Sequence, residues 1–291
     1  MPSTRKARST DTGVAADFAA GRRAIPIVAA QAAALIAGIR DPEAKSALVP
    51  WTVGEVAVHL ANVCLAYAES AADAFGDWMD SMPARPELRD RLGELNTLML
   101  DLIPREERAR IPDLLGERGR ALVEATAGRD PHERCRSPWF GEGDTVPLSA
   151  VVGLFLSESL LHSVDLARAS GQRFRIDPEH ARLVLSLVFP PMMPKTVNTG
   201  LAQELTADLR FHVRGGVTIG AAVRDGNVTV TRNPAAGSGR ADCHILLDPV
   251  AFLLVASGRT GRGGQIARGR MLPYGRKPWL GPAALRLFWF P

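Results

Sequence analysis

Two short segments of the sequence carry ionisable side chains at helical spacing. Glu158 and His162 are four residues apart, and Asp165 follows three residues later. A helix turns by about 100° per residue, so these three side chains share one narrow face. Val151 and Phe155 continue the same face, which indicates that the carboxylate and the imidazole point inward. Buried groups of this kind need polar partners.

A second histidine lies in a similar setting about a hundred residues earlier in the chain. His59 shares a helical face with the apolar residues Val56, Val63 and Ala66. A borderline divalent ion such as Zn²⁺ accepts imidazole nitrogen and carboxylate oxygen, and catalytic zinc sites keep three protein ligands and one open position. His59, Glu158 and His162 are therefore candidates for the three ligands of a metal ion.

Spacing alone favours another interpretation of these three residues. His59 would then be a core histidine bonded to a carbonyl group, and Glu158 and His162 would form a weak surface pair. Asp165 and Asn62 are candidates for residues that orient the imidazole rings without binding the ion themselves. Solvent exposure or a hydrogen bond between helices would explain these two polar residues equally well.

The remaining histidines and the nearest cysteine are interpreted as structural. Cys64 lies five residues after His59, on a different face of the helix, and is predicted to be a small core residue. Four histidines have no matched partner in the sequence: His132, His180, His212 and His244.

The elements that must position these residues are helical in the first half of the chain. Helices are predicted at 24–39, from Thr52 to about residue 75, and from Leu148 to about residue 170, where Gly171 ends the helix. Thr52 and Glu55 have the form of a capping box. Residues 87–127 resemble helical pieces interrupted at Pro104 and Pro112, and a connection rich in Pro and Gly follows at 128–147.

Beyond Gly171 the hydrophobic period changes from helical to alternating. A helix is predicted at 177–189, and another is predicted to begin at Asp248-Pro249. Asp225-Gly226 is a hairpin signal between two alternating runs. Strands are predicted at 207–213, 217–223, 227–232 and 241–247.

Composition and charge suit a globular protein of two domains. The chain has 291 residues, of which 46% are hydrophobic and 23% charged. Residues 1–170 hold 19 Lys+Arg against 24 Asp+Glu, a net charge of −5, whereas residues 171–291 hold 16 against 7, a net charge of +9. The arginines of the basic half are scattered singly, which argues against nucleic-acid binding.

Three widely spaced cysteines, and the absence of a long uninterrupted apolar run, predict a cytoplasmic protein that does not bind membranes.

The two helical segments resemble the mycothiol-dependent maleylpyruvate isomerase family of the DinB-like superfamily. The resemblance is carried by WTVGEVAVHL at 51–60 and by ESLLHSVDL at 158–166, and it covers roughly residues 20–170. It implies a DinB-like four-helix bundle with a divalent metal ion, usually zinc, bound at His59, Glu158 and His162. It also implies a low-molecular-weight thiol, mycothiol, as cosubstrate.

The second half is similar, less specifically, to a sterol-carrier-like (SCP2-like) α+β domain. Its closing segment at 276–291 has Leu, Phe and Trp residues that could line an apolar groove. The predicted organisation is thus an N-terminal tail at 1–19, a metal-binding bundle at 20–171 and an α+β domain at 172–291. No substrate-binding arginine can be assigned, and surface placement is expected for Arg210, Arg214, Arg224 and Arg276.

The function expected from this resemblance is that of a metal-dependent, mycothiol-dependent S-transferase. A metal-bound thiolate would act on an electrophilic small molecule. Two alternatives stay open: a thiol-dependent cis-trans isomerase of the maleylpyruvate type, and a non-catalytic carrier of an apolar ligand. The expected partners are the small-molecule substrate and the thiol, with a homodimer as one possible assembly.

Overall fold

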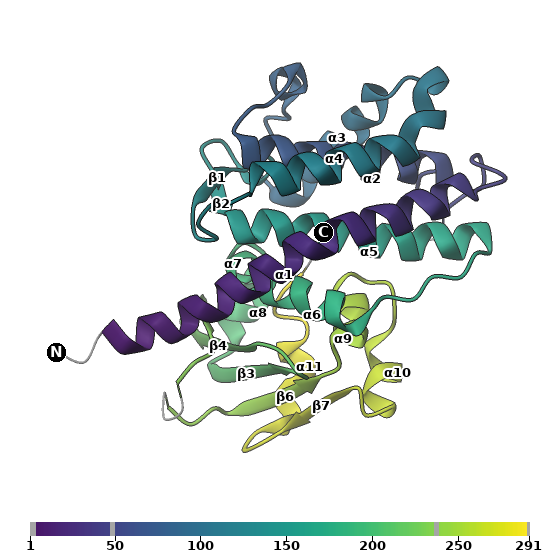
Figure 1. Ribbon diagram of the computed structural model, residues 1–291. Helices are drawn as coiled ribbons and strands as arrows, with labels where there is room; N and C mark the ends of the chain where they lie inside the picture. The colour runs from purple at the N-terminus through teal and green to yellow at the C-terminus, as the bar shows by residue number, and fades with distance from the viewer. Residues whose placement is uncertain (1–3, 47–49, 236–238, 290–291) are drawn as a thin grey trace. The chain divides into compact units, whose positions relative to one another are not determined.

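The computed structural model describes residues 4–46, 50–235 and 239–289, and the chain divides into two compact units. One unit is Phe18–Ile176, and the other joins Met1–Asp17 to Asp177–Pro291. Helix α1 (Thr4–Ala37) is the first element of the chain and contributes to both units. The architecture is mixed helix and sheet, as predicted (Figure 1).

The unit at 18–176 is built from long helices around a shared apolar core. Helix α2 (Val53–Ala72) packs against both α4 (Ile111–Ala125) and α5 (Leu148–Ser170). Gly119 of α4 lets α1 approach closely, because a β-carbon at this position would lie only 3.3 Å from Ile25 and 3.4 Å from Ala29. The shorter helices of this unit are η1 (Asp77–Ser81), α3 (Leu88–Leu98), η2 (Met99–Leu102), η3 (Arg105–Arg110) and η4 (Pro138–Phe140).

The predicted start and stop signals of these helices are confirmed. The Thr52 hydroxyl accepts a hydrogen bond from the Glu55 amide at 3.2 Å, and the Glu55 carboxylate accepts one from the Thr52 amide at 2.7 Å. Gly171 ends α5 with a φ of 69°, a conformation that favours glycine. Pro112 lies in the first turn of α4, where its missing N–H costs nothing, so it begins a helix instead of interrupting one.

Two features of the first half of the chain differ from the prediction. Residues 4–19 were expected to be a tail, but they form the first half of α1, which continues through Pro26. The connection at 128–147 contains a small antiparallel hairpin of β1 (Arg134–Arg136) and β2 (Thr145–Pro147). Its strands of three residues are too short for a period-2 pattern to reveal them.

The second unit contains a five-stranded sheet of order β5-β4-β3-β6-β7, in which only the β3–β6 pair is parallel. The strands are β3 (Ala207–Val213), β4 (Thr218–Arg224), β5 (Asn227–Arg232), β6 (Cys243–Leu247) and β7 (Met271–Tyr274). The Asp225-Gly226 turn has φ values of 50° and 76° and closes the β4–β5 hairpin as predicted. The strand β7 was not predicted, since a proline lies inside it.

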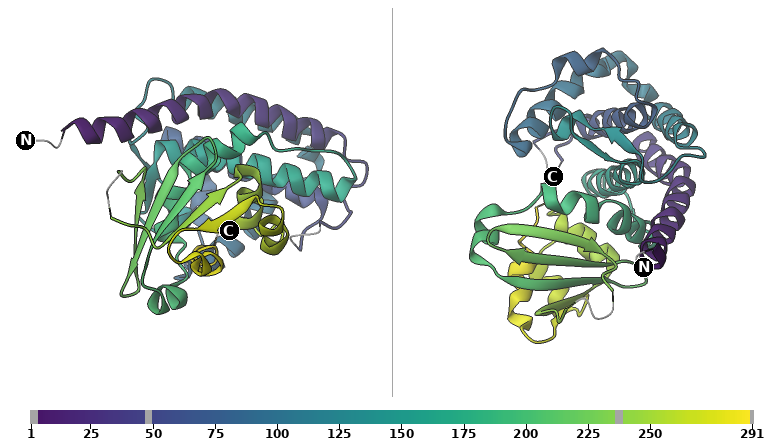
Figure 2. Two further views of the ribbon diagram at one scale, coloured as in Figure 1. Left: turned by 90° about the horizontal axis from the view of Figure 1, so that it is seen from below. Right: turned by 90° about the vertical axis from the view of Figure 1, so that its left-hand side faces the viewer.

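One face of this sheet is buried beneath helices (Figure 2). Alternate residues of β3, among them Leu209 and Phe211, are fully buried, while their neighbours are half-buried on the other face. The helices of the unit are α6 (Pro178–Leu187), α7 (Phe189–Met192), η5 (Met193–Lys195), α8 (Thr199–Glu204), α9 (Pro249–Ala256), α10 (Arg262–Ala267), η6 (Pro278–Leu280) and α11 (Gly281–Ala284).

Helix α5 is long and apolar enough to meet a simple criterion for a membrane-spanning helix. In the structure, 83% of its most apolar window is buried inside the protein. A core helix of a helical bundle is buried to this extent. Helix α5 also carries Glu158 and His162.

Candidate metal centre

Helices α2 and α5 bring the three predicted ligands together. His162 Nε2 lies 3.1 Å from the Glu158 carboxylate, and His59 Nε2 lies 3.9 Å from the same oxygen, Oε2. The rings of His59 and His162 are 4.9 Å apart, edge to face. All three ligand atoms fall within 4.8 Å of one another. The prediction that these side chains face inward is confirmed for both histidines, which are 4% and 7% exposed.

The donor set fits a divalent ion. Ligand atoms about 2.0–2.2 Å from a tetrahedral ion lie roughly 3.4 Å from one another. The distances from Glu158 Oε2 to His162 Nε2 and to His59 Nε2, 3.1 and 3.9 Å, lie close to this value on either side, and no pair of ligand atoms is more than 4.8 Å apart. Glu158 remains 25% exposed at its side chain, so the cluster is reached by solvent from the carboxylate side. Three ligands and an accessible side are the arrangement that leaves a position for a small molecule.

Asp165 fixes the orientation of His162. Its Oδ2 lies 3.1 Å from His162 Nδ1, and its side chain has no exposed surface. Because a carboxylate only accepts hydrogen bonds, Nδ1 carries a proton toward Asp165, which leaves Nε2 as the nitrogen available to a metal ion. Of the two alternatives left open for Asp165, the structure favours the orienting role.

Trp51 and the cap of α2 position His59. The ring of Trp51 lies 5.0 Å from the ring of His59, tilted by 45°. Thr52 and Glu55 close the first turn of α2 immediately behind it. Within the motif at 51–60, Thr52 thus caps the helix, Trp51 packs on the imidazole ring, and His59 is a candidate ligand.

Asn62 and Cys64 do not belong to the ligand cluster. The Asn62 side-chain amide donates a hydrogen bond to the Met99 carbonyl at 2.5 Å, so it connects α2 to η2 instead of orienting an imidazole. Cys64 is fully buried with its sulfur 4.0 Å from the Ser159 hydroxyl. It is a core residue, as predicted.

Tyr67 is a buried residue of α2 that the sequence analysis did not identify, with 7% of its surface exposed. Burial raises the pKa of Tyr67 well above its usual value, and the negative charge of Glu158 raises it further. The phenol therefore stays protonated at neutral pH.

His212 and His244 were expected to be without partners, and this expectation is wrong. His212 Nε2 lies 2.9 Å from His244 Nδ1, and their rings stack at 5.2 Å. Burial and their closeness lower the pKa of His212, and burial lowers that of His244. The parallel pairing of β3 with β6 creates this contact, and a parallel pairing cannot be derived from the spacing of two histidines.

The four arginines without an assigned role lie on the sheet unit. Arg224 pairs with Asp208 at 2.6 Å, Arg276 pairs with Asp242, and Arg214 donates to the Gly269 carbonyl. Arg210 lies against Gly220 across the β3–β4 pair. Ion pairs and cross-strand packing account for these positions.

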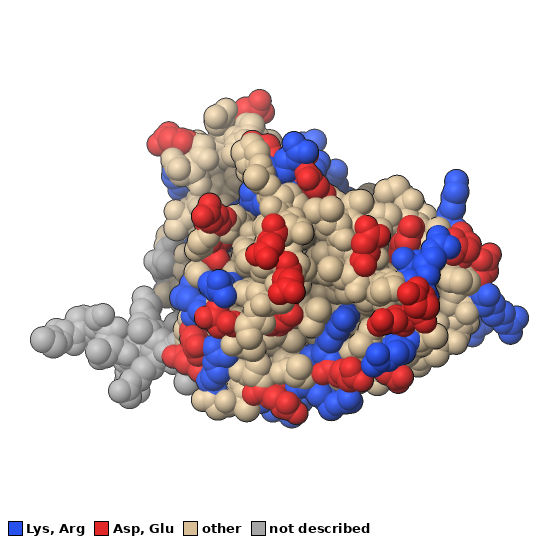
Figure 3. All heavy atoms as spheres, turned by 90° about the horizontal axis from the view of Figure 1, so that it is seen from above, with Lys and Arg blue, Asp and Glu red and all other residues tan. Residues whose placement is uncertain are grey.

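The surface charges do not form a single basic field on the face shown in Figure 3. Acidic and basic side chains of the described residues are interspersed there. Nucleic-acid binding usually requires a basic patch or stripe. The charges on this face therefore do not indicate nucleic-acid binding.

Comparisons with known proteins give a likeness in structure. No protein-family model matches the chain, and no curated protein matches its sequence. Among solved structures, the chain is similar to the mycothiol-dependent maleylpyruvate isomerase, at 16% identity and a TM-score of 0.49, over 88% of this chain and 92% of that chain. A single-residue variant of that isomerase gives a TM-score of 0.48 at the same identity and coverage. A stereoselective inverting sec-alkylsulfatase from Pseudomonas sp. is similar at 14% identity and a TM-score of 0.30, over 77% of this chain and 32% of that chain. The case for His59, Glu158 and His162 as candidate ligands accordingly rests on their own geometry.

Proposed function

We propose that the protein is a metal-dependent enzyme that adds a low-molecular-weight thiol to an electrophilic small molecule. The observation that carries the proposal is the convergence of His59, Glu158 and His162 within 4.8 Å on two packed helices. The motifs at 51–60 and 158–166, and the resemblance they carry, support a DinB-like bundle at 20–171. The strand order of the second half supports a sterol-carrier-like domain at 172–291. Mycothiol is the thiol that this resemblance indicates, and Zn²⁺ is the ion.

Each residue of the site has a defined task in this proposal. His59 and His162 present neutral imidazole nitrogens, Glu158 adds one negative charge, and Asp165 fixes the tautomer of His162. Trp51 covers His59 and limits its motion. A divalent ion bound here would lower the pKa of a coordinated thiol, so that the thiolate is available near neutral pH.

The thiol must come from outside the chain. All three cysteines are buried. Burial raises the pKa of Cys64 to about 12 and that of Cys135 to about 11, and it raises the pKa of Cys243 as well. Thiols of this kind are not nucleophiles at neutral pH. A cosubstrate thiol supplies the reactivity that the protein lacks.

Two outcomes follow from one addition step. The sulfur forms a bond to an activated alkene carbon, and the electron pair of the double bond moves to the activating carbonyl oxygen. In transfer, the resulting enolate takes a proton from solvent and the thioether is the product. In isomerisation, the new single bond rotates, the enolate pair reforms the double bond, and the thiol leaves unchanged. We propose transfer as the reaction of this chain and isomerisation as the alternative.

Thiol binding that depends on the metal tests the proposal. Calorimetry with mycothiol, in buffers of different ionisation enthalpy, is expected to show binding to the metal-loaded protein with release of a proton, because the coordinating thiol is deprotonated. Protein treated with a chelator is the control and is expected to bind far more weakly. Equal binding by both forms contradicts the proposal. Mass spectrometry of the thiol after turnover separates transfer, which consumes it, from isomerisation, which does not.

A second candidate function is carriage of an apolar ligand by the sheet unit. A cavity of about 410 Å³ in this unit supports it. Its lining combines apolar side chains, among them Met193, Phe211, Phe252, Phe288 and Trp289, with the polar or charged side chains of Asn198, Ser257, Arg262 and Arg286. Binding of a fluorescent apolar probe with equal affinity to metal-loaded and metal-free protein, together with the absence of metal in the protein as purified, would favour the carrier over the enzyme.

A further inference from the structure

We propose that His212 and His244 form a second metal site, in the sheet unit, that binds Cu²⁺ or Ni²⁺. Both residues are on strands of the segment at 177–291, and neither belongs to the candidate cluster on α2 and α5. The proposal therefore stands or falls independently of the proposed function. It assigns a task to two imidazoles that are half-buried on the sheet.

The first step concerns where the two imidazoles lie. His212 is on β3 and His244 is on β6. In the parallel register, His244 lies opposite Arg210, two residues before His212. Side chains of a strand alternate between the two faces, so the two histidines are diagonal neighbours on one face of the sheet. Their neighbours in each strand are buried, whereas the histidines remain in reach of solvent.

The second step concerns the distance between the rings. His212 Nε2 lies 2.9 Å from His244 Nδ1, and the two ring planes differ by 12°. Two imidazole nitrogens bound about 2.0–2.1 Å from one ion are roughly 2.9 Å apart at a right angle, but roughly 3.3 Å apart in a tetrahedron. Square-planar or tetragonal coordination is typical of Cu²⁺ and Ni²⁺. The distance therefore favours these ions over Zn²⁺.

The third step concerns the protons of the two rings. A neutral imidazole can carry its proton on either nitrogen. For His212 the outer nitrogen is Nδ1, which lies 3.2 Å from the Thr218 hydroxyl, and that hydroxyl can accept a hydrogen bond from it. With both protons on the outer nitrogens, the two facing nitrogens have free lone pairs. A rotation of the rings then directs both lone pairs at one ion.

The residues beside His244 restrain its ring. Tyr274 is its register partner on β7, and the two rings lie 5.0 Å apart with planes 24° apart. Gly275 follows with a φ of 105°, and a β-carbon there would lie only 3.0 Å from His244 Cδ2. The glycine thus leaves room for the imidazole. A ring that is already restrained loses less freedom when it binds an ion.

The charges around the pair set the expected affinity. Both imidazoles are uncharged at pH 7, because burial lowers the pKa of each below its usual value. Protons therefore compete little with a metal ion at these nitrogens. Arg210 is a positive charge on the same face of β3 and repels an incoming cation. Removal of this charge should therefore strengthen the binding of an ion.

The test adds Cu²⁺ to the full-length protein and follows it by electron paramagnetic resonance. His59→Ala serves as the background, so that copper at the candidate cluster on α2 and α5 does not obscure the signal. We expect a bound Cu²⁺ whose spectrum shows two nitrogen ligands. When His244→Gln is added, the dissociation constant should rise by more than the roughly 10- to 100-fold that loss of an outer contact costs, and the second nitrogen should disappear from the spectrum.

Two further variants in the same background serve as comparisons. His132→Gln removes an exposed histidine outside the sheet unit and is expected to leave the affinity and the spectrum unchanged. Arg210→Gln removes the neighbouring positive charge and is expected to lower the dissociation constant by about 3-fold, a change opposite to that of His244→Gln. Circular dichroism of the metal-free proteins checks that the fold is kept.

A second measurement needs no variant. Diethylpyrocarbonate modifies accessible imidazoles, and mass spectrometry of peptides locates each modified residue in the unchanged protein. Cu²⁺ is expected to protect His212 and His244 and to leave His132 reactive. The inference is overturned if His244→Gln folds and keeps the affinity and spectrum of its background. If His244→Gln does not fold, copper that leaves both imidazoles of the pair reactive overturns it.

Discussion

At the scale of single residues, the two histidines of the proposed site are each held by one partner. Asp165 contacts His162, and Trp51 packs on His59. Without such partners, a histidine can turn its ring or exchange tautomers, and each alternative lowers the fraction of protein ready to bind an ion. The affinity of the site should therefore respond to residues that never touch the ion.

Asp165→Asn tests this statement at His162. The amide can still accept a hydrogen bond, but it lacks the negative charge that favours the proton on Nδ1. We expect the affinity for Zn²⁺ to fall by about 10- to 100-fold, measured by competition with a coloured chelator. Asp113→Asn, on the exposed side of α4, serves as the control, and equal losses in the two variants would speak against an orienting role for Asp165.

The candidate ligands were predicted from the sequence and its resemblance, whereas the residues that support them could be predicted only in part. Glu158, His162 and His59 stand at helical spacings on faces that apolar residues extend, and that pattern indicates inward-pointing groups. Asp165 lies on the same face as His162 and was among the candidates. The contact of the Trp51 ring with the His59 ring was not predicted, because the sequence does not specify which ring packs on the imidazole.

At the scale of elements, α2 carries one candidate ligand and α5 carries the other two, and the first turn of α2 is the most explicit local signal in the chain. Both hydrogen bonds of the capping box are present, and the Trp51 ring that packs on His59 immediately precedes them. The cap thus determines where the helix begins and hence where His59 lies. Loss of the cap should affect both stability and the metal site.

Thr52→Ala is expected to reduce the free energy of unfolding by about 1 kcal/mol, because the Glu55 amide loses its acceptor. Urea denaturation followed by circular dichroism measures the change. Thr97→Ala provides the comparison: that hydroxyl donates to the Gly93 carbonyl on an exposed helix, and its removal should cost less than the loss of the cap. An equal loss of unfolding free energy in Thr52→Ala and Thr97→Ala would show that the capping box adds no stability beyond helix propensity.

Local signals predicted many elements well, and long-range contacts explain the failures. The strand at 207–213 and the turn at Asp225-Gly226 were predicted from alternation and turn chemistry, and both are present. The strand β7 and the β1–β2 hairpin were missed because they are short and owe their existence to a partner strand. The early start of α1 was missed because residues 4–19 show no apolar face from which a helix could be inferred.

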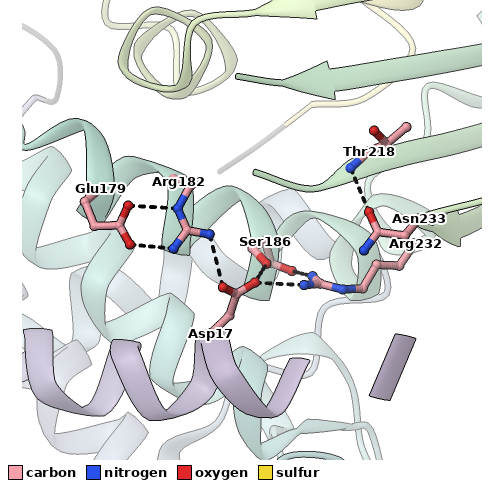
Figure 4. Close-up of polar contacts among 7 residues, drawn as sticks. All are labelled: Asp17, Glu179, Arg182, Ser186, Thr218, Arg232 and Asn233. Atoms are coloured by element: carbon pink, nitrogen blue, oxygen red, sulfur yellow. Dashed lines mark hydrogen bonds and ion pairs between the residues drawn. The ribbon is translucent and has the colours of Figure 1, made fainter. Parts of the chain in front are cut away.

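At the scale of the whole molecule, α1 is anchored at Asp17 to the unit that contains the sheet. Figure 4 shows the Asp17 carboxylate between Arg182 of α6 and Arg232 of β5, at 3.1 and 2.8 Å, with a further hydrogen bond from the Ser186 hydroxyl. All three charged side chains are less than one-fifth exposed. Burial alone would raise the pKa of Asp17, but the bonds from Ser186, Arg182 and Arg232 lower it below its usual value.

Asp17→Ala is expected to destabilise this unit by about 3 kcal/mol at neutral pH, because it leaves two buried guanidinium groups short of a partner. Protection of the α6 amides from hydrogen exchange should fall by about 100-fold. Glu179→Ala removes a carboxylate from the same Arg182, but that carboxylate is 57% exposed, so a loss below about 1 kcal/mol is expected.

The same network predicts a dependence on pH. Since the folded-state pKa of Asp17 is depressed, its contribution is complete above the usual value near 3.8 and is lost as the pH falls through the folded value. The difference between the unchanged protein and Asp17→Ala in the protection of the α6 amides from hydrogen exchange should therefore shrink below about pH 3.8. A difference that stays constant through that range would exclude an ionised Asp17 as its source.

The central claim is that His59, Glu158 and His162 together hold one divalent ion, and the metal content of the purified protein tests it most directly. Elemental analysis should give about one equivalent per chain for the unchanged protein. His59→Ala and Glu158→Ala should each lose most of it while keeping their helical content, because the apolar core around Phe155 and Leu160 does not depend on the ion. Full metal occupancy in both variants, or none in the unchanged protein after loading with Zn²⁺, would contradict the account.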